Sequence, residues 1–188
     1  MLRNLLGPFD YLRIKHDFKF KVDWLVPLIL TALSLATIYL LSKYHSVSII
    51  GSNGMAGKIL SFMQILPGFY IAALAAIATF QKNDIDQAMP SPAPTIALDI
   101  RGKKILAQLS RRRFLCSMFA FLTAESLLII FICITGELFG PAISIATPEY
   151  LHTWFKYIFS GILLLLCWQL IAATFWGLYY LGDRLHRD

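Results

Sequence analysis

A single carboxylic acid, Glu125, lies in the middle of an apolar run from Phe114 to Ile134. About 20 apolar residues cross the ~30 Å hydrocarbon core of a bilayer as a helix, so we expect Glu125 near the centre of a membrane span. A charge at that depth costs at least about 2.5 kcal/mol, and such residues usually face a bundle interior, a water-filled path or a partner. Glu125 is therefore the first residue to consider for chemistry.

Three further polar side chains are expected at the depth of Glu125. Spans that alternate in direction place Gln169, Tyr70 and Ser34 near the midplane of the other three apolar runs. Polar groups in hydrocarbon seek one another, because an unsatisfied polar group is expensive there. We therefore predict one intramembrane polar layer that contains Glu125, Gln169, Tyr70 and Ser34.

Two roles are open for Glu125. In the first role, a protonated Glu125 bonds to Gln169 or Tyr70 and holds the bundle or an oligomer together, since burial favours the neutral form of a carboxyl group. In the second role, Glu125 is a proton or cation relay site, or it lines a pore that opens on activation.

The sequence carries no pattern typical of an enzyme or a metal site. An HExxH motif, a P-loop, a GxSxG motif and an intramembrane pair of aspartates are all missing from it. Glu125 also has no second acid for hydrolytic catalysis. The three cysteines lie within apolar runs, away from any His or Cys at ligand spacing, and are interpreted as packing residues. We expect no catalytic residue, no metal and no cofactor.

The composition is that of an integral membrane protein. The 188 residues are 57% hydrophobic and 15% charged, with a mean hydropathy of +0.64, whereas soluble domains contain about 25% charged residues. The predicted fold is an all-α membrane protein, a four-helix transmembrane bundle. Its expected parts are an N-terminal arm (1–23), spans at 24–41, 59–80, 114–134 and 157–181, outer loops at 42–58 and 135–156, a cytoplasmic loop (81–113) and a C-terminal tail (182–188).

Basic residues set the predicted orientation. Of the 17 lysines and arginines, 14 lie on the side of both termini and of the central loop. The positive-inside rule makes that side cytoplasmic. Anionic headgroups near the inner leaflet account for most of the net charge of +6.

Six of these basic residues are predicted to contact lipid headgroups or a protein partner: Arg101, Lys103, Lys104, Arg111, Arg112 and Arg113. The arginine triplet at the start of the third span is interpreted as a stop-transfer and headgroup anchor. A phosphate or nucleic-acid contact is the lesser alternative for the triplet.

Two short stretches outside the spans have strand-like patterns. The strict alternation over 18–23 predicts a short strand, or else an interfacial segment with snorkelling lysines. The apolar stretches 95–100 and 105–109 flank a turn-like Arg-Gly-Lys-Lys, which predicts a β-hairpin in the cytoplasmic loop. The second limb of that hairpin fits equally well as a helix that leads into the third span.

Two spans carry small residues at every fourth position, which lets another helix approach closely. These residues are Gly68, Ala72 and Ala76 in the second span, and Ala173 and Gly177 on the stripe of Gln169 in the fourth. Pro67 removes a backbone hydrogen bond and should kink the second span, which would supply a hinge beside the polar layer. We expect homo-oligomers to pack along these stripes.

Three stretches carry a resemblance to a known family: the apolar run 66–80, the Met89-Pro90 step, and the sequence LSRRRFL at 109–115. Together they resemble small bacterial membrane proteins from antiphage defence islands, and in particular the transmembrane effector encoded beside a retron reverse transcriptase. The resemblance implies an inner-membrane effector that the reverse transcriptase and its RNA–DNA hybrid hold silent. Phage attack would release it to permeabilise the membrane, and the cell would die before phage mature.

Two other functions stay open. Retron effectors of this class are usually described with two spans, whereas four are counted here, and the membrane subunit of Kiwa-type defence resembles a four-span protein. That alternative is a non-toxic anchor or sensor of a cytosolic defence complex, in which Glu125→Gln would be silent. The third function is a small transporter in which Glu125 couples proton movement to substrate, with a pH-dependent flux.

Overall fold

The computed structural model describes residues 6–16, 18–44, 47–51, 53–79, 86, 93–100 and 103–181, without the side chains of 97–100 and 103–105. Four helices in it are long and apolar enough to cross a membrane. The chain is therefore an all-α, multi-pass membrane protein, as predicted from its hydropathy.

The first spanning helix consists of a π-helical turn, η2 (Lys21–Leu25), that runs directly into α2 (Val26–Ser42). The second span is divided into α3 (Met55–Met63) and α4 (Leu66–Thr79). The third and fourth are α6 (Arg111–Ala146) and α7 (Glu149–Tyr179). The smaller elements are a 3-10 helix, η1 (Gly7–Arg13), and strands β1 (Thr95–Ile100) and β2 (Lys103–Gln108).

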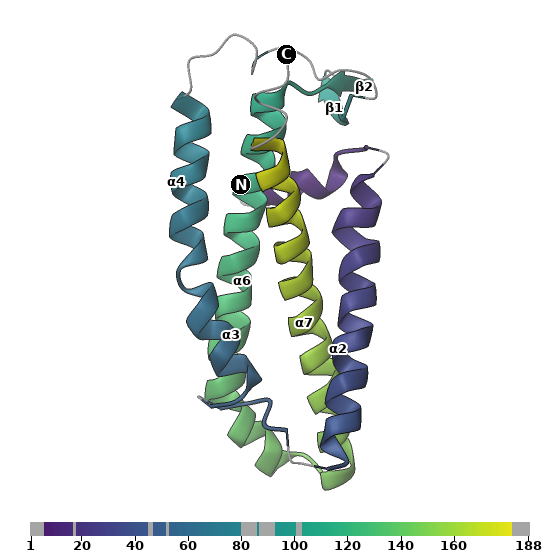
Figure 1. Cartoon of the computed structure of the whole chain (residues 1–188), viewed down its shortest axis with the longest axis vertical. Coiled ribbons are helices and arrows are strands. Elements are labelled where there is room, and N and C mark those ends of the chain that lie inside the picture. The colour runs from purple at the N-terminus through teal and green to yellow at the C-terminus, as the bar shows by residue number, and fades with distance from the viewer. Residues whose placement is uncertain are drawn as a thin grey trace.

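The long helices lie side by side in the order α4, α6, α7 and α2, with α3 continuing the line of α4 against α6 (Figure 1). The buried core follows α6, which contributes large side chains such as Phe114, Met118 and Leu122. The two outer helices, α2 and α4, expose much of their apolar surface. Apolar side chains on the outside of the assembly are what a lipid environment favours.

Both strands and η1 lie at one end of the molecule, which we call the hairpin end (Figure 1). Helix η1 packs against α6 there, where the ring of Tyr11 stacks on Phe121 at a centroid distance of 5.0 Å and Phe9 meets the same ring edge-on at 6.0 Å. The segment 6–16, which contains η1, is called the N-terminal segment below.

The predicted β-hairpin is confirmed. Strands β1 and β2 pair antiparallel, with a register that runs from Thr95 opposite Gln108 to Ile100 opposite Lys103. Lys15 of the N-terminal segment adds a further antiparallel bridge to β1, since Lys15 and Thr95 exchange two backbone hydrogen bonds of 2.9 and 3.0 Å. The hairpin is therefore tied to the N-terminal segment through its backbone.

The strand predicted over 18–23 is wrong, because residues 19–25 are helical. An extended chain would hold Lys19 and Asp23 about 13 Å apart. The helix brings these two side chains together one turn apart on a buried face and turns Lys21 outward. The alternating pattern thus has a different cause: a buried ion pair and exposed aromatic residues on the first turns of a helix.

The stretch 135–156, which was predicted as an outer loop, is almost entirely helical, since α6 and α7 occupy nearly all of it. Gly136 and Gly140 permit close packing there and do not mark turns. A Cβ atom on Gly136 would lie 2.7 Å from Phe159, and one on Gly140 would lie 2.8 Å from Ile50. Helix α6 also continues through Pro141.

The second span is interrupted between α3 and α4, as the position of Pro67 suggested. Proline has no N–H to donate to the carbonyl of Met63, four residues earlier, and its ring clashes with that carbonyl. Helix α3 accordingly ends at Met63 and α4 begins at Leu66. Whether this break serves as a hinge stays a prediction.

The two stripes of small residues face different surroundings. Ala173 and Gly177 are buried against α6, where a Cβ on Gly177 would come within 2.5 Å of the Met118 side chain. Gly68, Ala72 and Ala76 instead lie on the exposed face of α4, and a Cβ on Gly68 would meet nothing within 4 Å. Only the stripe on α7 is an internal helix contact.

Gly177→Leu is expected to destabilise the chain by about 1–3 kcal/mol, because the larger side chain would force α7 away from α6. Gly68→Leu is the matched control and should change the free energy of unfolding by less than about 0.5 kcal/mol. Circular dichroism during SDS titration of the full chain in maltoside micelles measures both values. Equal destabilisation by the two variants would contradict this packing.

Candidate functional site

The most unusual group of side chains in the molecule is a buried polar cluster at the hairpin end. It consists of Tyr11, Lys19, Asp23, Glu125 and Gln169, each at most 5% exposed. These residues come from the N-terminal segment, the start of the first spanning helix, α6 and α7. We call this group the buried cluster.

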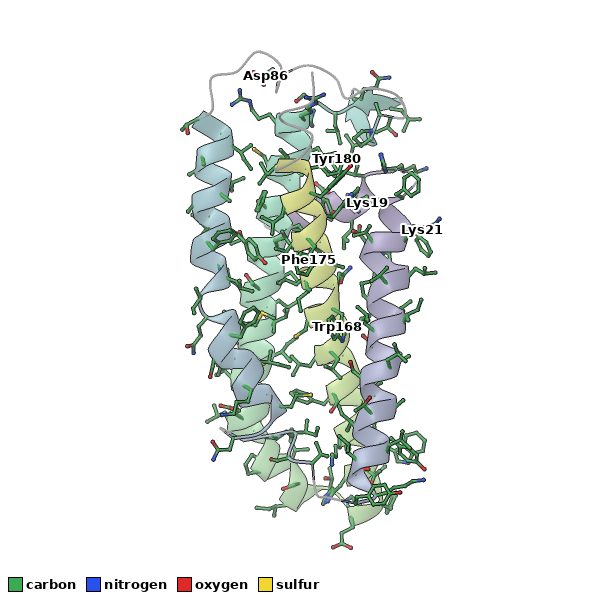
Figure 2. All side chains as sticks on the ribbon, viewed as in Figure 1. Lys19, Lys21, Asp86, Trp168, Phe175 and Tyr180 are labelled. Carbon is green, nitrogen blue, oxygen red and sulfur yellow. The ribbon has the colours of Figure 1, made fainter. Side chains whose placement is uncertain are left out.

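Lys19 and Asp23 form an ion pair at the centre of the buried cluster. The hydroxyl of Tyr11 donates a hydrogen bond of 3.2 Å to Oδ1 of Asp23, while Lys19 contacts Oδ2. The Lys19 ammonium also lies 3.9 Å from the centroid of the Tyr11 ring, which is a cation–π arrangement. One tyrosine thus contacts both members of the ion pair (Lys19 is labelled in Figure 2).

The backbone of Asp23 is held by α7. In an α-helix the carbonyl of Asp23 would accept from residue 27, but Pro27 has no N–H. Nε2 of Gln169 donates to this carbonyl instead, at 3.1 Å. The π-helical turn that contains Asp23 ends beside Pro27, so the local sequence explains both the irregular turn and its link to α7.

Burial shifts the pKa of Tyr11 and of Lys19, the two members of the buried cluster that precede the first span. Burial first, and then the nearby Asp23, raises the pKa of Tyr11 well above its ordinary value of 10.0. The Tyr11 hydroxyl therefore keeps its proton and can donate a hydrogen bond to Asp23. Burial lowers the pKa of Lys19, and the attraction of Asp23 opposes this change. The ion pair with Asp23 therefore stabilises the charged form of Lys19.

Glu125 differs from every other member of the buried cluster. Its side chain is 1% exposed, and neither carboxyl oxygen has a hydrogen-bond partner among the described residues. It lies within electrostatic range of Tyr11 and Asp23. The buried cluster therefore holds two carboxyl groups and one ammonium group, so Lys19 cannot neutralise both acids.

The other members of the predicted polar layer have partners elsewhere. Tyr70 bonds to Thr174 of α7 at 2.6 Å. Ser34 accepts a 3.1 Å bond from the indole of Trp168, which is labelled on α7 in Figure 2. The hydrogen bond that we expected between Glu125 and Gln169 or Tyr70 is not present, because Gln169 donates its described bond to Asp23.

The basic residues predicted to contact lipid headgroups or a partner differ in their surroundings near the start of α6. Arg112 binds its own chain: it contacts both carboxyl oxygens of Asp86, at 2.7 and 2.9 Å, and donates to the last carbonyls of α4 at 3.0 and 3.1 Å. The hydrogen bonds from Arg112 to Asp86 lower the pKa of the Asp86 carboxyl group. Arg111 is half-buried and Arg113 is exposed. Arg101 and the side chains of Lys103 and Lys104 lie outside the described part of the structure.

Our reading of the sequence missed Tyr11, Lys19 and Asp23. The available signal was a Lys and an Asp four residues apart at the start of an apolar run, followed by Pro27 four residues later. That spacing places both charges on one helical face and leaves a carbonyl without its usual donor. Tyr11 gave no comparable signal, because its contact depends on how the N-terminal segment folds over α6.

The described residues include no group of three or more His, Cys, Asp or Glu side chains that could hold a metal ion. No protein-family profile, curated protein or solved structure matches the chain. The arrangement of the buried cluster is therefore the main evidence about function.

Lys19→Met is expected to destabilise the folded chain by about 3–5 kcal/mol, because it leaves the Asp23 charge buried without an opposite charge. The double change Lys19→Met with Asp23→Leu should recover most of that loss. Arg13→Met, which removes the exposed Arg13–Asp10 pair, is the control and should cost at most about 1 kcal/mol. SDS titration in micelles gives these values. A double variant no more stable than Lys19→Met would contradict the pairing.

Glu125→Leu is expected to stabilise the chain by about 1–3 kcal/mol, because it removes a buried carboxyl group that has no hydrogen bond. Gln169→Leu should instead destabilise it by about 1 kcal/mol, since the Asp23 carbonyl would lose its donor. The same SDS titration compares the two. Destabilisation by Glu125→Leu would show that Glu125 makes a contact that stabilises the fold.

Proposed function

We propose that the chain is a membrane effector that permeabilises the membrane to ions. The structure described above would be its closed state. Opening would occur when the N-terminal segment leaves the buried cluster. Asp23 and Glu125 would then meet water and line a path for cations. The observation that carries this proposal is that the buried cluster contains two acids, Asp23 and Glu125, whereas its one lysine, Lys19, pairs with Asp23.

A protein that serves only as an anchor has no need of this arrangement. Replacing buried ion pairs by apolar residues of similar size is often neutral or stabilising, so the buried cluster is costly to keep for stability alone. Ionisable groups inside membrane proteins are typical of ion and proton pathways. The carboxyl group of Glu125, which has no lysine of its own, therefore favours a function in which Glu125 moves from a buried environment into contact with water.

The N-terminal segment offers a physical route from the surface to the buried cluster. Tyr11 contacts Asp23, and Lys15, four residues later, pairs with Thr95 of the hairpin. Leu106 of the hairpin is 63% exposed and could be contacted by another protein. A partner that holds or displaces the hairpin would therefore act on the segment that covers Asp23.

The resemblance to retron effectors supplies the proposed biological setting. The protein would lie in the bacterial inner membrane with both termini and the hairpin in the cytoplasm, as the distribution of basic residues indicates. A cytosolic defence complex, a reverse transcriptase with its RNA–DNA hybrid, would keep the chain closed. Copies of the chain would associate through the outward stripe of Gly68, Ala72 and Ala76. No catalytic step is proposed.

The hairpin also fits a second function, that of a non-toxic anchor or sensor of a Kiwa-like complex. Its exposed apolar residue Leu106 would suit a cytosolic partner whether or not the helices open. This function requires no movement at Glu125, and it predicts that expression of the chain leaves the membrane potential unchanged.

The membrane potential of cells that express the chain without its partner separates the two functions. Wild-type chain is expected to depolarise the cells, whereas Glu125→Gln and Glu125→Leu should reduce the effect at least several-fold while accumulating to the same level. Glu149→Gln, at the exposed first turn of α7, is the matched control and should depolarise like wild type.

An unchanged potential in all four strains would contradict the effector function and support the anchor. Equal depolarisation by all four would place the leak away from Glu125. A leak that rises with a pH gradient and with one added substrate would instead support a proton-coupled transporter.

A further inference from the structure

A pocket of about 310 Å³ opens beside the Lys19–Asp23 ion pair at the hairpin end. Ligand pockets in proteins begin at about 300 Å³, so this pocket is large enough for the headgroup of a small amphiphile. Lys15, His16, Lys19, Asp23, Phe20 and Trp24 are the lining residues that matter for its chemistry.

The charged lining favours an anion. Two lysines, Lys15 and Lys19, line the pocket against one carboxylate, and because Asp23 is already paired with Lys19, Lys15 carries the remaining positive charge. Lys15 is exposed and forms none of the ion pairs of the described residues. His16 accepts a hydrogen bond from the Phe18 N–H at Nδ1, which places the imidazole proton on Nε2. Lys15 is thus the group best placed to meet a ligand at the mouth.

The other side of the pocket is apolar and continues along the first spanning helix. Phe20 is 66% and Trp24 39% exposed, and Leu28 and Ile29 of α2 extend the same exposed apolar surface. Lysine beside exposed aromatic residues at the end of a span is typical of the boundary between headgroups and acyl chains. The pocket therefore combines an anion-binding mouth with a surface for hydrocarbon.

We propose that this pocket binds the phosphate headgroup of an anionic phospholipid. Lys15 contacts the phosphate at the mouth, Lys19 forms the floor, and the acyl chains lie on the apolar surface of Phe20, Trp24 and α2. This binding site does not depend on the effector function, because a lipid could bind the closed chain whether or not it ever opens.

Calorimetric titration of the full chain in maltoside micelles tests the proposal. The probes are dihexanoyl phosphatidylglycerol, dihexanoyl phosphatidylcholine and inorganic phosphate. Phosphatidylglycerol should bind more tightly than phosphatidylcholine. Lys15→Gln should weaken its binding about fivefold, the effect of one basic residue beside an anionic lipid. Lys21→Gln is the matched control and should change binding less than twofold, since Lys21 is an exposed lysine two residues after Lys19 and does not line the pocket.

Three outcomes would overturn the proposal. Equal weakening by Lys15→Gln and Lys21→Gln would mean that general surface charge attracts the lipid. Equal affinity for the two lipids would remove the role of the anionic headgroup. Displacement of phosphatidylglycerol by millimolar inorganic phosphate would assign the pocket to a free anion. Because Lys15 pairs with Thr95 through its backbone, the Lys15→Gln chain should fold, and circular dichroism checks this.

Discussion

The charge of Asp23 is the constraint on which the hairpin end of this molecule depends. A carboxylate within an assembly of apolar helices has to be neutralised and hydrogen-bonded, because burial without partners costs several kcal/mol. Lys19 supplies the opposite charge, and Tyr11 supplies a hydroxyl donor. Meeting this requirement fixes the first turns of the first spanning helix and places the N-terminal segment across α6.

Glu125 is a second buried carboxyl group in the same region, which contains only one lysine among the members of the buried cluster. Lys19 is committed to Asp23, and Glu125 has no hydrogen-bond partner in the described part of the chain. The described structure therefore contains a buried group that would gain from contact with water or a cation. This imbalance and the backbone link from Lys15 to the hairpin are the two features that support a function involving movement of the N-terminal segment.

The sequence predicted the parts of the fold that depend on local composition. The four spans follow from the length of apolar runs, the hairpin from paired strand patterns, and the break in the second span from Pro67. The features it could not predict depend on which faces meet. Gly68 and Gly177 belong to similar four-residue patterns, yet only Gly177 is packed against another helix. Gly136 had the same turn-like signal as a loop glycine, although it serves close packing inside α6.

The membership of the buried cluster was unpredictable for a related reason. Depth along each span predicted Gln169 and Glu125 in one layer, but depth does not say which hydrogen bonds form. Gln169 donates to the Asp23 backbone carbonyl because Pro27 has no N–H to bond to it. Tyr11 contacts the Asp23 side chain only because the N-terminal segment packs over α6. Long-range contacts of this kind require the three-dimensional structure.

The most direct test of the central claim is the ion leak of liposomes that contain the Lys15→Cys/Thr95→Cys double variant. These two residues form a hydrogen-bonded antiparallel pair, whose Cα separation of about 5.5 Å suits a disulfide. Oxidation should lock the N-terminal segment to the hairpin and reduce the leak, and reduction should restore it, while each single variant should leak equally under both conditions. An equal leak from the locked and reduced double variant would contradict the claim that movement of this segment opens the membrane path.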